Sequence, residues 1–306
     1  MLKKTNFTIS LIFKIIQNKA RFLFWIFIRF LSALLPLLSI YLFSLAIRDL
    51  ETKAIFSSVF FLMILILIVQ VIDNFTRLRS LFKLDECISD IGFDIHNYFN
   101  KNLKAEAKIE RHESVQAIRN FSDASTITLR LFRQPGIDSI VSMIAVPAIL
   151  FFIDFKIFVL EIAYIFIYMI IDYYTTQKYV KFRDIQNTKI ETYYAKLQDS
   201  VDVDLEQKTF TRHFTRLSNW NFVEWFLLQN TAVFFYTLIF AYSVVAVLSG
   251  YKQISDVVLI MGYITSTQTF LNSFSEIKDS LSDMNVALEH LAKNKNISTL
   301  DLDDLV

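Results

Sequence analysis

The sequence predicts an all-α integral membrane protein with six transmembrane helices and long helical extensions on one side of the membrane. Of the 306 residues, 54% are apolar, and only four glycines and three prolines interrupt them. An all-β fold needs many tight turns, which glycine and proline favour, so their scarcity argues against that fold class. Charged residues still make up 20% of the chain, so apolar and charged residues must separate into long blocks.

Six stretches of the chain are long and apolar enough to cross a bilayer, which takes about 20 residues per helix. We expect spans at 22–48, 54–75, 134–153, 157–177, 225–249 and 255–275. The third and fourth spans are separated by a tight turn at 154–156, because a single helix cannot use all the apolar residues of this region.

Lysines and arginines are distributed unevenly between the two sides of this topology. With both termini inside, 26 of the 31 basic residues fall in inner segments and four in outer turns. Basic residues favour the cytoplasmic side. We therefore expect a multi-pass protein of the plasma (inner) membrane with both termini in the cytoplasm. The net charge of +1 gives no reason to expect a nucleic-acid partner.

The two long inner segments, 76–133 and 178–224, keep a helical pattern of apolar residues. In the first segment these residues are Leu78, Leu81, Phe82, Ile88, Ile91, Ile95, Phe99 and Leu103. Such stripes predict amphipathic helices packed on partners. We expect spans two to five to continue into the cytosol as two helical hairpins, reaching about 35–40 Å beyond the membrane. Their tips are expected near 109–117 and 199–208.

This layout resembles the transmembrane domain of an ATP-binding cassette (ABC) exporter, of the six-helix type that works as a dimer. The resemblance covers about residues 10–295. Residues 248–256 resemble the family's short outer loop between the fifth and sixth helices, and 280–291 resemble the exit of the sixth helix toward the ATPase domain. Residues 115–123 resemble the stretch after the first coupling helix, although the family often has a glycine where this chain has Ser114 and Val115. Asp199 and Ser200, followed by Lys208 and Phe210, resemble the second coupling region.

The resemblance implies one transmembrane domain at 1–295, with 296–306 as an acidic C-terminal tail or the start of a linker. It implies the permease subunit of an ATP-driven exporter in the lipid bilayer, paired as a homodimer or heterodimer and driven by an ABC ATPase (nucleotide-binding) subunit. Residues expected to couple to that ATPase are Arg111, His112, Glu113, Ser114, Val115, Gln116, Asp199, Ser200, Val203, Leu205 and Lys208.

A phosphate-binding loop of the form G-x-x-x-x-G-K-[ST] cannot be placed in this sequence. The four glycines are Gly92, Gly136, Gly250 and Gly262, and none of them begins that spacing. We therefore expect the chain not to be an enzyme by itself and to carry no cofactor, with Mg-ATP bound by the partner domain. Four scattered histidines and the single Cys87 also predict no metal site.

Polar and charged side chains within the spans are candidates for a translocation cavity. They are Arg29, Glu161, Gln229, Asn230, Thr265, Gln268 and Asn272. A charge at membrane depth predicts a functional role. Two structural roles compete with transport: the neutral side chains can form hydrogen bonds between helices, and the side chain of Arg29 can reach the membrane interface.

Two further functions compete with the exporter subunit. The first is an ion-coupled secondary transporter whose relay is formed by Glu161, Asp172, Asp73 and Arg29. Long cytosolic hairpins are not needed by such a carrier, and the two halves of the chain show no obvious repeat. The second is a non-transporting membrane scaffold derived from an exporter half.

Overall fold

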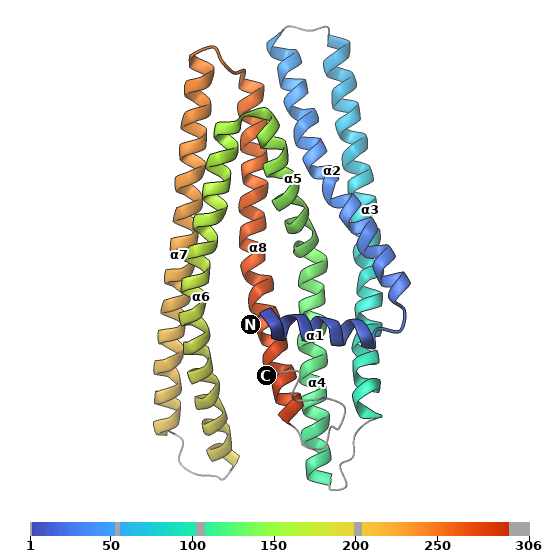
Figure 1. Ribbon diagram of the computed structural model, residues 1–306, viewed down its shortest axis with the longest axis vertical. Helices are drawn as coiled ribbons and strands as arrows, with labels where there is room; N and C mark the ends of the chain where they lie inside the picture. The colour runs from blue at the N-terminus through green and yellow to red at the C-terminus, as the bar shows by residue number, and fades with distance from the viewer. Residues whose placement is uncertain (1, 53–55, 102–107, 199–203, 294–306) are drawn as a thin grey trace. The chain divides into compact units, whose positions relative to one another are not determined.

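The computed structural model is all-helical and describes residues 2–52, 56–101, 108–198 and 204–293 (Figure 1). Its elements are α1 (Leu2–Ile15), α2 (Lys19–Glu51), α3 (Phe56–Asn100), α4 (Lys108–Leu131), the π-helical turn η1 (Phe132–Gly136), α5 (Ile137–Ile153), α6 (Phe155–Gln198), α7 (Asp204–Leu248) and α8 (Ile254–Lys293). The predicted all-α class is confirmed.

Five stretches of the described residues are long and apolar enough to cross a membrane. They are Lys19–Glu51, Ser57–Asn100, Ser114–Ile153, Gln207–Leu248 and Ile254–Glu289, and together they indicate a multi-pass membrane protein. Each contains most or all of one predicted span. The remaining predicted span, 157–177, lies within α6, which is not one of the five. The six-span topology therefore stays a prediction.

Four helices are about twice as long as a bilayer requires. The helices α3 and α7 have 45 residues each, α6 has 44 and α8 has 40, whereas about 20 residues cross the hydrocarbon core. The predicted reversal at 109–117 is wrong, because α3 ends at Asn100 and α4 already begins at Lys108. The predicted reversal at 199–208 begins correctly, since α6 ends at Gln198 and α7 begins at Asp204.

The chain forms two compact units. The first contains the residues up to Val146 and those from Gln253 onward, and the second runs from Pro147 to Lys252. In the first unit, α3 packs against α2 and α4, and α8 packs against α4 and α2. In the second unit, α6 and α7 pack against each other.

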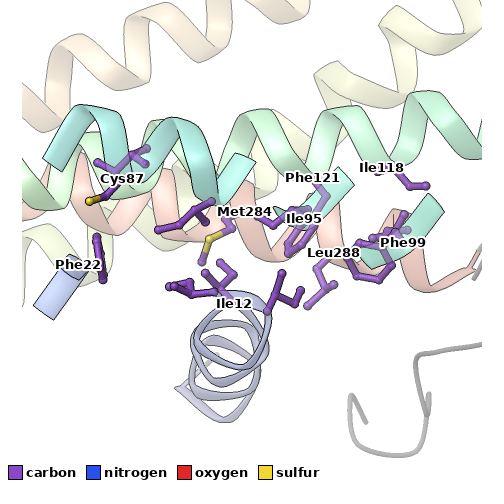
Figure 2. Close-up of a cluster of buried hydrophobic side chains, with 14 of the residues drawn as sticks. Ile12, Phe22, Cys87, Ile95, Phe99, Ile118, Phe121, Met284 and Leu288 are labelled. Carbon is purple, nitrogen blue, oxygen red and sulfur yellow. The ribbon is translucent and has the colours of Figure 1, made fainter. Parts of the chain in front are cut away.

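A hydrophobic cluster joins α1, α3, α4 and α8, with Phe22 of α2, in the first unit (Figure 2). It confirms part of the predicted stripe, because Ile88, Ile91, Ile95 and Phe99 are all buried there. Phe82 is exposed instead. At about 100° per residue it points roughly 120° away from Ile88. The apolar pattern thus places the packed face of α3 correctly but includes residues beyond that face.

The N-terminal helix α1 lies across α8 and α3 (Figure 1) and was not foreseen as a separate element. Its apolar face enters the cluster, where Ile12 lies beside α8 (Figure 2). Its polar side is held by Asn285 of α8, which accepts a 2.7 Å hydrogen bond from Thr8 and donates a 2.8 Å hydrogen bond to Thr5. Apolar burial and paired polar groups together dock α1 on the unit.

Asp154 joins the ends of the helices in the second unit. Its side chain accepts hydrogen bonds from the backbone N–H groups of Lys156 (2.9 Å) and Ile157 (3.4 Å), as an N-cap of α6 does. It also pairs with Lys252, just after α7, at 2.9 Å. Burial raises the pKa of the Asp154 carboxyl, but the hydrogen bonds from Lys252 and Lys156 outweigh it and hold that pKa below its ordinary value.

Candidate functional site

Arg29 is the most deeply buried charged side chain of α2, with 0% of its surface exposed. Its Nη2 donates a short hydrogen bond to Oδ2 of Asp138 on α5, and its Nη1 donates to the hydroxyl of Ser32 at 2.9 Å. A charge taken out of water is tolerated only when it is paired and hydrogen-bonded. The guanidinium of Arg29 is thus held inside the unit by Asp138 and Ser32.

A second arginine extends this pair into a cluster of four charges. Arg77 of α3 donates to Asp73, one turn earlier, at 3.3 Å, and its Nη1 lies 4.0 Å from Oδ2 of Asp138. Along the cluster the order is Arg29, Asp138, Arg77, Asp73, so each cation lies beside an anion. The four formal charges cancel.

The turn η1 positions Asp138 in this cluster. Gln134 leaves the helical conformation, with φ −156° and ψ 118°, and Pro135 has no N–H to continue a helical ladder. Gly136 is buried, and a Cβ there would lie 3.0 Å from the side chain of Ile277. The chain thus breaks its helix between α4 and α5 and restarts it with Asp138 in the first turn of α5.

A cavity of about 330 Å³ lies next to the cluster. Arg77 and Asp138 line it, together with Gln134, Ser139 and Ser142. Further polar groups come from α8, which contributes Ser266 and Thr269. The remaining walls are apolar. Both the volume and this mixed lining are typical of small-molecule sites.

Two buried atoms of the cluster make no hydrogen bond within the described part of the chain: Nε of Arg29 and Oδ1 of Asp138. Buried polar atoms nearly always have a partner, in the protein, in water or in a ligand. Since Asp138 also lines the cavity, its Oδ1 is a candidate contact for a bound molecule.

The predicted cavity residues are distributed over both units. Arg29 belongs to the cluster of the first unit. On α8, Thr265 is exposed and Gln268 and Asn272 are half-buried, while their neighbours Ser266 and Thr269 line the cavity. In the second unit, Glu161 is buried on α6, and on α7 Gln229 is half-buried and Asn230 donates to the carbonyl of Phe226 at 2.7 Å. The transport role of these residues stays a prediction.

The predicted coupling residues that the structure describes lie near the starts of α4 and α7. Ser114 is buried, Val115 is 41% exposed, and Gln116 is exposed and donates to Asn120 at 2.9 Å. Lys208, in the first turns of α7, is exposed as well. Asp199, Ser200 and Val203 lie outside the described residues, as do the side chains of Arg111, His112, Glu113 and Leu205.

A second polar group joins α6 and α7. Glu224 accepts hydrogen bonds from Thr175 (3.0 Å) and Thr176 (3.2 Å), and Trp220 donates its indole N–H to the Thr175 carbonyl at 3.0 Å. Asp172 is buried one turn earlier on α6. These bonds give the buried carboxylate of Glu224 hydroxyl partners and join α6 to α7.

Sequence reasoning missed Asp138, Arg77 and the serines around them as site residues. Asp73 and Arg77 are four residues apart at the end of the second span, and Asp138 lies at the start of the third. In the predicted topology both places are on the same side of the membrane. This common side of the membrane could have indicated the site, because charged residues at the same membrane depth on adjacent spans are able to form ion pairs.

No protein-family model matches the chain, and no match is found among curated proteins. Within the described residues no group of three or more His, Cys, Asp or Glu side chains is arranged to hold a metal ion.

Proposed function

We propose that the chain is the permease subunit of an ATP-driven ABC exporter in the plasma membrane, working as a dimer with ATPase domains that bind Mg-ATP. The observation that carries this proposal is the length of α3, α6, α7 and α8, at 40–45 residues each. About 20 residues of each helix suffice to cross the bilayer. The remaining residues reach roughly 30 Å beyond it. Rigid projections of this length suit a subunit that receives movement from a partner outside the membrane.

The exposed residues at the ends of these projections support a docking role. Val115 is an apolar side chain left 41% exposed near the start of α4. In the proposed mechanism, ATP binding draws the docked ATPase domains together, and α3, α4, α6 and α7 carry that closure to the membrane-embedded cavity as rigid levers. The sites at Val115 and Lys208 would then make contact with the ATPase.

Substitution at the docking site tests the proposal. The full chain is co-expressed with an ABC ATPase subunit, and the two are co-purified. Val115→Asp is expected to abolish co-purification while leaving the melting temperature unchanged. Ile127→Asp is the matched control, because Ile127 is an exposed residue (53%) further along the same helix. Retained binding in a well-folded Val115→Asp variant counts against the exporter assignment, and so does a large loss of stability.

The predicted membrane orientation is tested by labelling. Cysteines placed at Thr52 and Gln253 are expected to react with a membrane-impermeant thiol reagent added outside cells. A cysteine at Glu113 should react only after the membrane is opened. Labelling of the Glu113 position from outside would reverse the topology and separate the proposed docking ends from cytosolic ATP.

A second candidate function is an ion-coupled carrier, which the buried Arg29–Asp138 pair and its neighbour Arg77 favour. Carboxylates at membrane depth are frequent proton-relay groups. A carrier of this kind would dissipate a proton gradient across proteoliposomes that contain the chain alone when the co-transported substrate is present. The exporter assignment predicts no such leak, and it predicts that Asp138→Asn leaves the decay of the gradient unchanged.

A further inference from the structure

We propose that the 330 Å³ cavity of the first unit binds an α-amino acid with an apolar side chain, held as the zwitterion. The lining presents hydrogen-bond acceptors for an ammonium group and, close to them, a cationic donor for a carboxylate.

The lining of the cavity offers hydrogen-bond acceptors from α5 and α8. The hydroxyls of Ser139, Ser266 and Thr269 each donate to the backbone carbonyl four residues earlier, at 2.9, 3.1 and 3.1 Å. A hydroxyl has one hydrogen and two lone pairs, so these three groups present acceptors to a ligand. The buried Oδ1 of Asp138, which has no partner within the described residues, adds a charged acceptor. An ammonium group, with three donors and no acceptor, matches this set.

The adjacent donor is the guanidinium of Arg77. Its Nε and Nη2 are directed to Asp73 at 3.2–3.3 Å, whereas Nη1 makes only the longer 4.0 Å approach to Asp138. Nη1 is therefore available to a carboxylate. Because this donor lies beside the carboxylate that would receive the ammonium, the two charges of the ligand must also be close together. An α-amino acid has that short separation.

Charge balance favours a zwitterion over a simple ion. The four charges of Arg29, Asp138, Arg77 and Asp73 already cancel, and Arg29 is fully buried. Adding a net charge to a poorly solvated site costs free energy. A ligand with one charge of each sign avoids that cost and pairs with both Asp138 and Arg77.

The apolar part of the lining accommodates the side chain of the ligand. Ala33 and Leu37 of α2 and Phe270 of α8 contribute to the walls. The volume of about 330 Å³ lies at the lower end of the range for small-molecule sites. An aliphatic residue such as leucine fits this combination. That the bound amino acid is the transported substrate rests on the proposed transport function. That it binds in this cavity does not depend on that proposal.

Calorimetry on the purified full chain in lipid nanodiscs tests the inference with three matched probes. L-leucine carries both charges, L-leucinamide only the ammonium, and N-acetyl-L-leucine only the carboxylate. Leucine is expected to bind, and each analogue to bind roughly tenfold to a hundredfold more weakly, because each loses one charge-assisted interaction. No detectable binding of leucine, or equal affinity for leucinamide, overturns the zwitterion assignment.

A substitution that fills the cavity without touching the charges gives the second readout. Ser142→Leu places a large side chain in the lining and is expected to weaken leucine binding at least tenfold. Ser57→Leu is the matched control, because Ser57 is exposed on α3 away from the lining, and it should bind leucine as the wild type does. Unchanged affinity in Ser142→Leu overturns the location. A chain that binds leucine but no ATPase would refute the exporter proposal alone, and the converse result would refute this inference alone.

Discussion

Removing the carboxylate of Asp138 is expected to destabilise the protein more than removing the guanidinium of Arg29, although the two form one ion pair. Asp138→Asn leaves Arg29 charged and 0% exposed, with only neutral acceptors beside it: the hydroxyl of Ser32 at 2.9 Å and the amide oxygen of the new asparagine. Arg29→Met removes the buried charge altogether. The remaining carboxylate of Asp138 is 28% exposed and still has Arg77 at 4.0 Å.

The two costs follow from these surroundings. Leaving a buried charge without its partner costs about 3–5 kcal/mol, which we expect for Asp138→Asn. Leaving a partly solvated acceptor with a weaker partner costs about 1–3 kcal/mol, which we expect for Arg29→Met. The double variant should resemble Arg29→Met, because the buried charge is then absent and the asparagine has nothing to neutralise.

The assay is unfolding by sodium dodecyl sulfate in mixed micelles, followed by tryptophan fluorescence. Asp123→Asn serves as the control, since its side chain is 62% exposed and pairs with Arg119 only at 3.8 Å. It should change the free energy of unfolding by less than about 1 kcal/mol. If Arg29→Met costs as much as Asp138→Asn or more, the reasoning that Arg29 is held in a poorly solvated place by Asp138 is refuted.

Three further outcomes are expected. Gly262→Ala should destabilise the protein by about 1–3 kcal/mol, because its Cβ would lie 2.7 Å from Cγ2 of Ile40; Ile40→Ala in the same chain should recover part of the melting temperature. Because the pKa of Asp154 is lowered in the folded protein, its carboxylate stabilises the fold above about pH 4, and that contribution is lost as the pH falls through the folded-state pKa. Unfolding measured between pH 3 and pH 7 should therefore show a smaller pH dependence in Lys252→Met than in the wild type. Ile95→Ala should cost about 2–5 kcal/mol in the same assay, since Ile95 is fully buried between α1, α3, α4 and α8, and a cost under about 1 kcal/mol would contradict that packing.

Helix positions were predictable because they depend on local composition. Long runs with almost no glycine or proline have no chain-intrinsic reason to break. The helix α7 has neither residue, α3 has only Gly92, and both run for 45 residues as expected. The reversal before α4 was misplaced because nothing in 101–117 is strong turn chemistry. The helix α1 was missed because its 14 residues are too short and too mixed to be recognised as a span. It is stabilised by Asn285 and by the cluster on α3 and α8, which are contacts from distant parts of the chain.

By itself the sequence determined that this chain is helical, apolar enough for a membrane, and marked by a charge inside its first span at Arg29. Only the tertiary structure decided which charged residue pairs with Arg29. Asp138 lies 109 residues further along the chain and meets Arg29 because η1 interrupts the helix just before α5. The sequence also did not determine which residues line the cavity. Thr265 and Ser266 are neighbours in sequence, but only Ser266 lines the cavity. Periodicity sets the angle between side chains on one helix, whereas the packing of α2, α3, α5 and α8 sets which angle points inward.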